Sequence, residues 1–88
     1  MLTEDHKKKL HSLMKEEISD YNAKSSLAAE MVKADEMYTA KVLMLAAKDE
    51  ESHARYLRDV LLDSGYQIPP ADEQAYQAME THFHRAHT

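Results

Sequence analysis

Hydrophobic residues recur at helical spacing along two long stretches of the chain, residues 4–32 and residues 36–63. Placed on a helix at about 100° per residue, the first stretch has one apolar stripe and the second has two. The stripe of the first stretch consists of Leu10, Leu13, Met14, Tyr21, Ala28, Met31 and Val32. The second stretch has one stripe of Leu43, Ala46, Ala47, Ala54, Leu57 and Leu61, and a second row of Tyr38, Val42, Leu45, Tyr56 and Val60. This pattern predicts two amphipathic helices, the second of which must be covered on two faces.

Local signals mark the ends of these two helices. Thr3 is an expected N-cap, because acidic residues, which the helix dipole favours, follow it in the first turn. Asp35 is the expected N-cap of the second helix, after a tight turn, and Gly65 can take the left-handed position that ends this helix. The alternative is one unbroken helix of about 60 residues, which is several times the usual helix length. We therefore expect an antiparallel hairpin.

The remaining residues predict a short third helix. Pro69 and Pro70 end the regular structure that precedes it. Residues 71–85 then have one apolar face, formed by Ala75, Tyr76, Met79 and Phe83. The whole chain contains one Gly and two Pro, which favours helices over strands. The sequence thus predicts an all-α fold in a single domain of residues 1–88.

The composition excludes several classes of function. The 88 residues contain no Cys, which excludes a disulfide framework, a thiolate zinc site and thiol catalysis. The net charge of −5 at pH 7 argues against nucleic acid as a partner. No apolar run approaches the roughly 20 residues of a membrane span, so we expect no membrane partner and a cytoplasmic location.

Three polar residues lie on the apolar stripes. Glu50 falls at the centre of the second helix's stripe with His53 inside its edge, and Glu17 falls near the centre of the first helix's stripe. The midpoint between Glu17 and Glu50 lies at the predicted turn, so the two carboxylates stand level in an antiparallel hairpin. Burying an ionised carboxylate without a partner costs several kcal/mol or more. We therefore expect a cation between these side chains, with Asp20 as the substitute for Glu17 if the hairpin is shifted.

A two-fold copy of the hairpin would complete a four-helix bundle around these residues. The pair of chains then supplies two copies each of Glu17, Glu50 and His53, and four carboxylates balance two divalent cations. Oxygen and imidazole ligands without sulfur suit iron or manganese and disfavour a closed structural zinc site. Two alternatives remain open from the residues: a metal-free polar cluster that fixes the pairing of a helical oligomerisation module, and metal carriage, including manganese or zinc, without redox turnover.

The segment of residues 49–54, Asp-Glu-Glu-Ser-His-Ala, resembles the second-helix motif of the ferritin-like superfamily, which includes rubrerythrins and bacterioferritins. The step of 33 residues from Glu17 to Glu50 is similar to the first-helix spacing in those families. A single hairpin with a short third helix resembles the encapsulated ferritins, half-ferritins that dimerise to build their centre. The resemblance covers residues 10–62.

This resemblance implies a ferroxidase that oxidises Fe(II) to Fe(III) with O₂ or peroxide, for iron storage or detoxification. It implies two iron ions per homodimer, with Glu50 bridging or chelating, His53 as a terminal ligand and Glu17 as the first-helix ligand. It also implies an encapsulin-type shell as a partner, although no targeting tail is visible after Arg85. The second apolar row of residues 38–60 predicts assembly beyond the dimer.

The chain departs from the family pattern near the first ligand. Many ferritin-like first helices carry a Tyr two turns after the ligand Glu, where this chain has Lys24. Tyr21, one turn after Glu17, is instead expected in core packing or in a hydrogen bond to a ligand. Glu16 partly matches the acidic rim that serves as an entry route for iron. We expect the Lys24 side chain to extend past the edge of the seam to water.

A second acidic and imidazole group lies near the end of the chain. Glu80, His84 and His87 follow the i, i+4, i+7 spacing of one helix face. This spacing would suit a second metal site. The simpler interpretation is a hydrated helix end.

Overall fold

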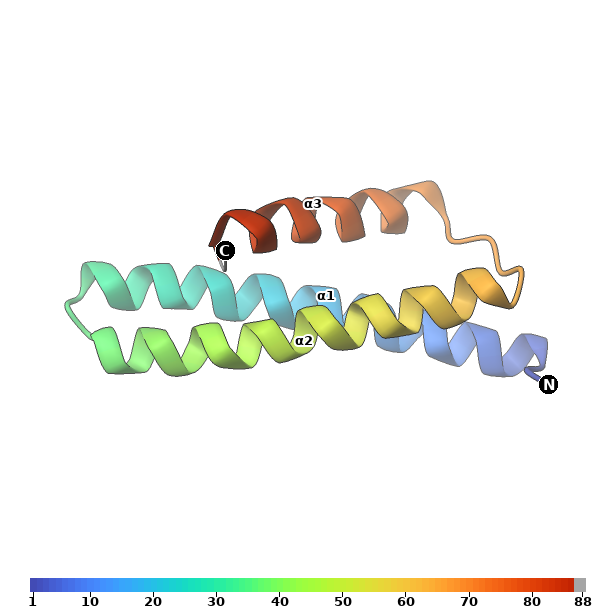
Figure 1. Ribbon diagram of the computed structural model, residues 1–88, viewed down its shortest axis with the longest axis horizontal. Helices are drawn as coiled ribbons and strands as arrows, with labels where there is room; N and C mark the ends of the chain where they lie inside the picture. Colours follow the sequence, from blue (N-terminus) through green and yellow to red (C-terminus); the bar gives the residue numbers. More distant parts are fainter. Residues whose placement is uncertain (87–88) are drawn as a thin grey trace.

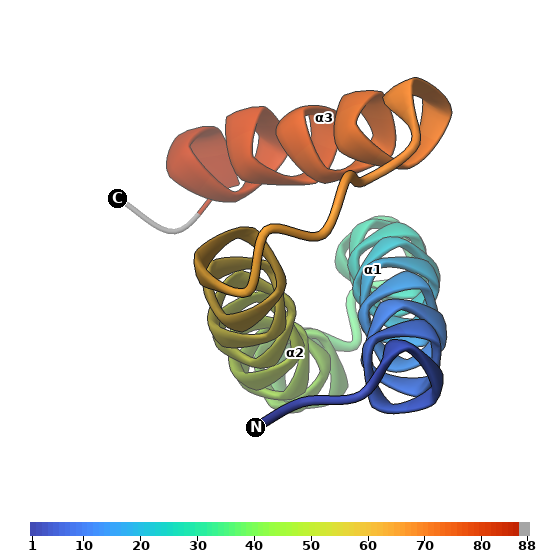
Figure 2. The ribbon, with the colours of Figure 1, turned by 90° about the vertical axis from the view of Figure 1, so that its right-hand side faces the viewer.

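The computed structural model describes residues 1–86, which form three helices, α1 (Glu4–Lys33), α2 (Met37–Asp63) and α3 (Pro70–Ala86). α1 and α2 pack side by side as an antiparallel hairpin, and α3 runs back along one side of it (Figure 1). The end view places α3 across one side of the hairpin (Figure 2). The predicted all-α fold, with its hairpin and short third helix, is confirmed. None of the helices within the described residues is long and apolar enough to span a bilayer.

Thr3 caps α1 as expected. Its Oγ1 accepts a hydrogen bond from the backbone N–H of His6 at 3.0 Å, and Nδ1 of His6 accepts one from the backbone N–H of Thr3 at 3.2 Å. These reciprocal bonds satisfy two backbone donors that the helix leaves without a partner. Glu4 and Asp5 lie in the first turn, where negative charge stabilises the helix end.

The turn between α1 and α2 lies where the sequence predicted it, but Asp35 does not cap α2. Ala34 ends α1, and Asp35 has φ 60°, in the left-handed region. Asp is one of the few non-glycine residues that adopt this conformation readily. Glu36 precedes α2 instead, and its backbone N–H donates to the Met31 carbonyl at 2.8 Å. The N-cap prediction for Asp35 is wrong, because this residue reverses the chain while an N-cap needs extended backbone.

Gly65 ends α2 as expected. Its φ of 80° is the left-handed conformation that glycine adopts without steric cost. The backbone N–H groups of Gly65 and Tyr66 donate to the carbonyls of Leu62 and Leu61, both at 3.0 Å. The Tyr66 side chain packs back on the core. This cap directs the chain into the loop that leads to α3.

The core lies where the three helices meet. It contains the buried side chains of Met14, Ile18, Tyr21, Ala47, Ala54, Leu61, Tyr76 and Met79. Ala47 and Ala54 are fully buried, and side chains this small let helix backbones approach closely. The core therefore combines a narrow seam on α2 with large side chains from α1 and α3.

The start of α3 is fixed to both long helices. Arg58 of α2 donates two hydrogen bonds to the Glu73 carboxylate, at 2.8 and 2.6 Å, and this guanidinium lowers the pKa of Glu73. On α1, His11 Nε2 lies 2.7 Å from the Asp72 carboxylate, and His11 Nδ1 shares a hydrogen bond with the Tyr66 hydroxyl. Bidentate and charge-assisted contacts of this kind are the stronger hydrogen bonds. α3 is therefore a fixed cover for one side of the hairpin.

The side of the hairpin turned away from α3 carries exposed apolar side chains. We call it the open face, and at helical spacing it comprises Leu13, Glu17, Lys24 and Leu27 of α1 and Val42, Glu50, His53 and Val60 of α2. Leu13, Leu27, Val42 and Val60 are each between 43% and 48% exposed. Farther round α2, Tyr38, Leu45 and Tyr56 are also exposed. Apolar clusters of this kind mark surfaces that bind other molecules.

Two adjacent leucines on α2 give a test of this core. Leu61 is fully buried, whereas Leu62 is 45% exposed. Leu61→Ala should lower the free energy of unfolding by about 2–5 kcal/mol, because it leaves a cavity among packed side chains. Leu62→Ala should lower it by less than about 1 kcal/mol. Urea unfolding at one fixed protein concentration measures both, and equal losses in the two variants would contradict this core.

Candidate metal centre

Glu17 and His53 meet across the open face. Glu17 lies on α1 and His53 on α2, and His53 Nδ1 is 3.5 Å from Glu17 Oε2. The Glu17 side chain is 26% exposed, and the His53 side chain is 58% exposed. The antiparallel hairpin sets this register, because both residues lie at matching distances from the turn. The imidazole therefore remains accessible from the open face while it touches a half-buried carboxylate.

Glu50 lies beside this pair, and its nearest positive charge is Lys24. The Glu50 side chain is only 12% exposed, and its Oε1 accepts a hydrogen bond from Lys24 Nζ. This hydrogen bond raises the pKa of Lys24 above its ordinary value. The expectation that Lys24 extends past the seam to water is therefore wrong, because the buried carboxylate of Glu50 attracts its ammonium group.

The second carboxylate oxygens of Glu17 and Glu50 are left without hydrogen bonds. Oε2 of each residue is buried, and neither has a hydrogen-bond partner among residues 1–86. The 3.5 Å contact of Glu17 with His53 is longer than a good hydrogen bond. Buried carboxylate oxygens without partners are costly unless a cation binds them. Two such oxygens beside an imidazole are a donor set that suits a divalent transition metal.

A single chain does not complete a metal site. Within residues 1–86, no group of three or more acidic or imidazole side chains is arranged to hold a metal ion. The structure brings Glu17 and His53 together and places Glu50 in contact with Lys24 instead. Three ligands can therefore converge only if Lys24 leaves Glu50, or if another chain supplies further ligands.

Glu16, the residue considered for the rim of the site, and Asp20, the residue considered as a substitute for Glu17, are both exposed on α1. Asp20 is close enough to Lys24 to add to the rise in the Lys24 pKa. Glu17, which is less exposed than Asp20, is the α1 carboxylate that lies against His53.

Tyr21 is directed toward α3 and away from the open face. It is fully buried, and its hydroxyl shares a 2.8 Å hydrogen bond with His82 Nδ1. Burial is the main cause of its raised pKa. The side chain also packs edge-on against the rings of His82 and Phe83. Tyr21 therefore packs in the core and helps to hold α3.

A pair of carboxyl groups under α3 was missed by the sequence analysis. Glu51 of α2 has a 3% exposed side chain, and Arg55 Nε donates to its Oε2 at 3.1 Å. Burial, together with a hydrogen bond and the charge of Glu51, raises the pKa of Glu80 on α3 to about 7. The nearby Tyr76 hydroxyl also has a raised pKa, mainly because it is buried. The sequence feature that could have indicated this pair is the position of Glu51 on α2, about 100° round the helix from Glu50 and on the side that α3 covers.

The C-terminal group of residues does not form the second metal site that its spacing allowed. His84 Nε2 lies 3.5 Å from Glu80 Oε2, but Glu80 is mainly engaged with Glu51 and Tyr76. His87, the third candidate, lies outside the described residues. Arg55 and Lys48 line the same pocket as Glu51 and Glu80, and their positive charges disfavour a metal cation there.

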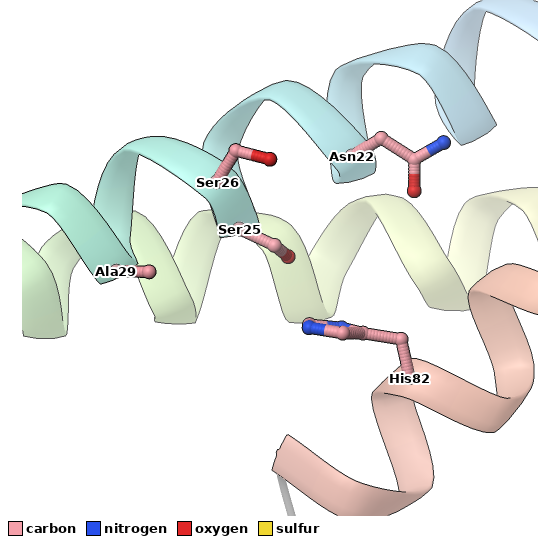
Figure 3. Close-up of a pocket in the computed structure, with 5 residues that line it drawn as sticks. All are labelled: Asn22, Ser25, Ser26, Ala29 and His82. Atoms are coloured by element: carbon pink, nitrogen blue, oxygen red, sulfur yellow. The ribbon is translucent and has the colours of Figure 1, made fainter.

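A cleft of about 330 Å³ lies between α1 and α3 (Figure 3). Its lining consists of Asn22, Ser25, Ser26, Ala29 and His82. Figure 3 shows the His82 ring beneath the Ser25 side chain, with the Asn22 amide above and to the right of both. This lining contains no carboxylate, so the cleft lacks the anionic ligands that a hard divalent cation needs. The open face remains the better candidate for a metal centre.

The carboxyl pair under α3 predicts a loss of stability at high pH. The folded-state pKa of Glu80, about 7, lies above the 4.5 of an exposed glutamate. This group therefore stabilises the folded chain fully below pH 4.5, and the contribution is lost as the pH rises through 7. At pH 8.5 the free energy of unfolding of Glu80→Gln should be about 1–3 kcal/mol larger than that of the wild type, so the variant is more stable. At pH 4.5 the two proteins should differ little.

The control for this experiment is Glu30→Gln, which changes an exposed glutamate on α1. Urea unfolding from pH 4.5 to pH 8.5 should give the same pH profile for this control and for the wild type. A Glu80→Gln profile parallel to that of the wild type would show that Glu80 does not carry the pH dependence.

No protein-family model, curated protein or solved structure matches this chain. Its likeness to ferritin-like proteins therefore stays a hypothesis that rests on its own residues. The chemically distinctive feature of the chain is the set of Glu17, Glu50 and His53 on the open face.

Proposed function

We propose that two copies of this chain pack their open faces together as a four-helix bundle and oxidise Fe(II) to Fe(III) at a two-metal site between them. The ligands are Glu17, Glu50 and His53 of each copy. One observation carries the proposal: Glu17 and Glu50 each have a buried carboxylate oxygen without a hydrogen-bond partner among the described residues. These oxygens lie on a face where a single chain leaves apolar side chains exposed.

The donor set fits iron. Carboxylate oxygen and imidazole nitrogen are ligands for iron and manganese, and zinc accepts them as well. Two chains bring four carboxylates, whose charge balances two divalent cations. Because one chain presents no complete three-ligand group within residues 1–86, the second copy is needed to close the site. This geometry supports two iron ions per homodimer.

The chain's residues would act by binding, orientation and charge. Fe(II) is the substrate, and two Fe(II) ions each lose one electron to O₂, which takes up two protons and becomes hydrogen peroxide. With hydrogen peroxide as the oxidant, the same two electrons and two protons give two water molecules. Anionic Glu17 and Glu50 stabilise Fe(III) more than Fe(II), because the higher charge interacts more strongly with carboxylates. His53, which is exposed in the single chain, would complete the ligand set from the edge.

Exposed apolar residues support assembly beyond the dimer. Tyr38, Leu45 and Tyr56 lie farther round α2 than the open face, so a two-fold pair would leave them exposed. A half-ferritin of this size encloses no volume for a mineral. Stored iron would therefore need a larger shell around the assembly, such as an encapsulin-type compartment in the cytoplasm.

A non-catalytic metal-binding or helical oligomerisation module is the second candidate. Two contacts favour it: Lys24 neutralises Glu50, and His53 lies against Glu17. In a metal-binding module the same residues would hold a cation without redox turnover. In an oligomerisation module they would only fix how two hairpins pair. Assembly would then be independent of divalent metal.

Removal of the Glu50 or the His53 side chain should strongly slow iron oxidation. Glu50→Ala and His53→Ala should each lower the rate of Fe(II) oxidation by about 100-fold or more, because a side chain that binds the metal directly contributes more than the groups that only orient the ligands, whose loss costs about 10–100-fold. Oxygen consumption and the absorbance of Fe(III) measure the rate, and parallel assays with hydrogen peroxide identify the preferred oxidant. Glu30→Ala, at an exposed position on α1, is the matched control.

Oxidation at the wild-type rate by the Glu50→Ala or His53→Ala variant would contradict the ferroxidase proposal. Circular dichroism of each variant checks that a lost activity does not reflect a lost fold.

Metal binding and dimer formation should depend on each other. A ligand that binds only the assembled state stabilises it by mass action, so Fe(II) or Mn(II) should raise the dimer fraction at low protein concentration. Light scattering after size-exclusion chromatography, with metal and with chelator, measures this fraction. An assembly that binds no metal and keeps the same mass under both conditions would favour the oligomerisation module.

A further inference from the structure

Lys24 occupies an unusual place beside the proposed ligands. It lies on α1 seven residues after Glu17, so both side chains share the open face. Its ammonium group donates to Oε1 of Glu50, across the seam between α1 and α2. A cation therefore already stands at the carboxylate that the proposed function assigns to metal.

The surroundings of Lys24 allow this contact to break. Its side chain is 37% exposed, so the ammonium can turn into water on a flexible stem of four carbons. Asp20, one turn earlier on α1 and exposed, offers another carboxylate within its electrostatic reach. Glu50, by contrast, is largely buried and cannot move to water with the same ease. The lysine is thus the mobile partner of the pair.

We propose that Lys24 is an internal counter-ion that holds Glu50 in the metal-free protein and has to leave when a divalent cation binds. This inference rests on the proposed function, because it takes Glu50 as a metal ligand. Lys24 is a positioning residue that sets metal affinity through Glu50. It stabilises the empty site and, by the same contact, weakens metal binding.

The charge of the proposed two-chain site indicates what Lys24 contributes to assembly. In a two-fold pair, four carboxylates from Glu17 and Glu50 would carry a charge of −4, and two Lys24 groups reduce it to −2. Carboxylates that face each other in an apolar seam repel strongly. Lys24 lets two chains assemble before metal arrives, and each incoming cation then competes with an ammonium group.

Substitution of Lys24 should move two measurements in opposite directions. With chelator, Lys24→Met should have a lower melting temperature than the wild type, because Glu50 loses its partner. With Mn(II) as the probe, the same variant should bind about threefold to tenfold more tightly, because the competing cation is gone. Electron paramagnetic resonance of free Mn(II) at fixed pH measures the binding.

Two control variants separate competition from a general effect on packing. Lys24→Arg keeps the cation and should show the metal affinity of the wild type, within about twofold. Lys15→Met makes the same chemical change at an exposed position on α1 and should change neither measurement. A merely structural role for Lys24 would weaken Mn(II) binding in Lys24→Met together with its stability.

The outcomes distinguish the two proposals. If the wild type binds Mn(II) and Lys24→Met binds it equally or more weakly, the counter-ion inference is overturned while the proposed function stands. If the wild type binds neither Mn(II) nor Fe(II), the proposed function fails and this inference fails with it. Tighter binding by Lys24→Met, with a lower melting temperature in chelator, supports the inference.

Discussion

A carboxylate held between two apolar helices needs a positive charge beside it, and this constraint governs the hairpin of this protein. Glu50 stands at the seam of α1 and α2, where water reaches little of its side chain. In the single chain Lys24 supplies the charge. One oxygen of Glu50 and one of Glu17 still lack partners among residues 1–86. The proposed metal chemistry follows from this unmet requirement, because divalent cations satisfy several carboxylates at once.

The hairpin has two sides with different roles. The side under α3 is closed by large apolar side chains and by ion pairs such as Arg58 with Glu73. The open face keeps Leu13, Val42 and Val60 exposed around the polar residues. A small domain of this size gains little from its own core, so association through the open face would add substantially to its stability. The same contact would assemble the ligands.

Local sequence signals predicted much of this structure, and tertiary contacts explain the rest. The cap at Thr3 and the left-handed Gly65 follow from the chemistry of single residues, and helical spacing alone placed Glu17, Glu50 and His53 near the seam of the two long helices. Across the hairpin, however, Glu17 lies against His53, whereas Glu50 contacts Lys24. The Glu51 and Glu80 pair was missed because its burial depends on where α3 docks, which periodicity does not encode. The Lys24 contact was missed because a long flexible side chain reaches several partners at similar energy.

The two alanines that flank Glu50 on α2 have a further consequence. Ala47 and Ala54 are fully buried, and their small size lets α1 and α2 approach closely. The separation of α1 and α2 beside Glu50 is therefore set by helix packing during folding. In the proposed site, a cation would meet carboxylates on helices whose separation is already fixed, so part of the conformational entropy cost of gathering its ligands would be met during folding, before the cation binds.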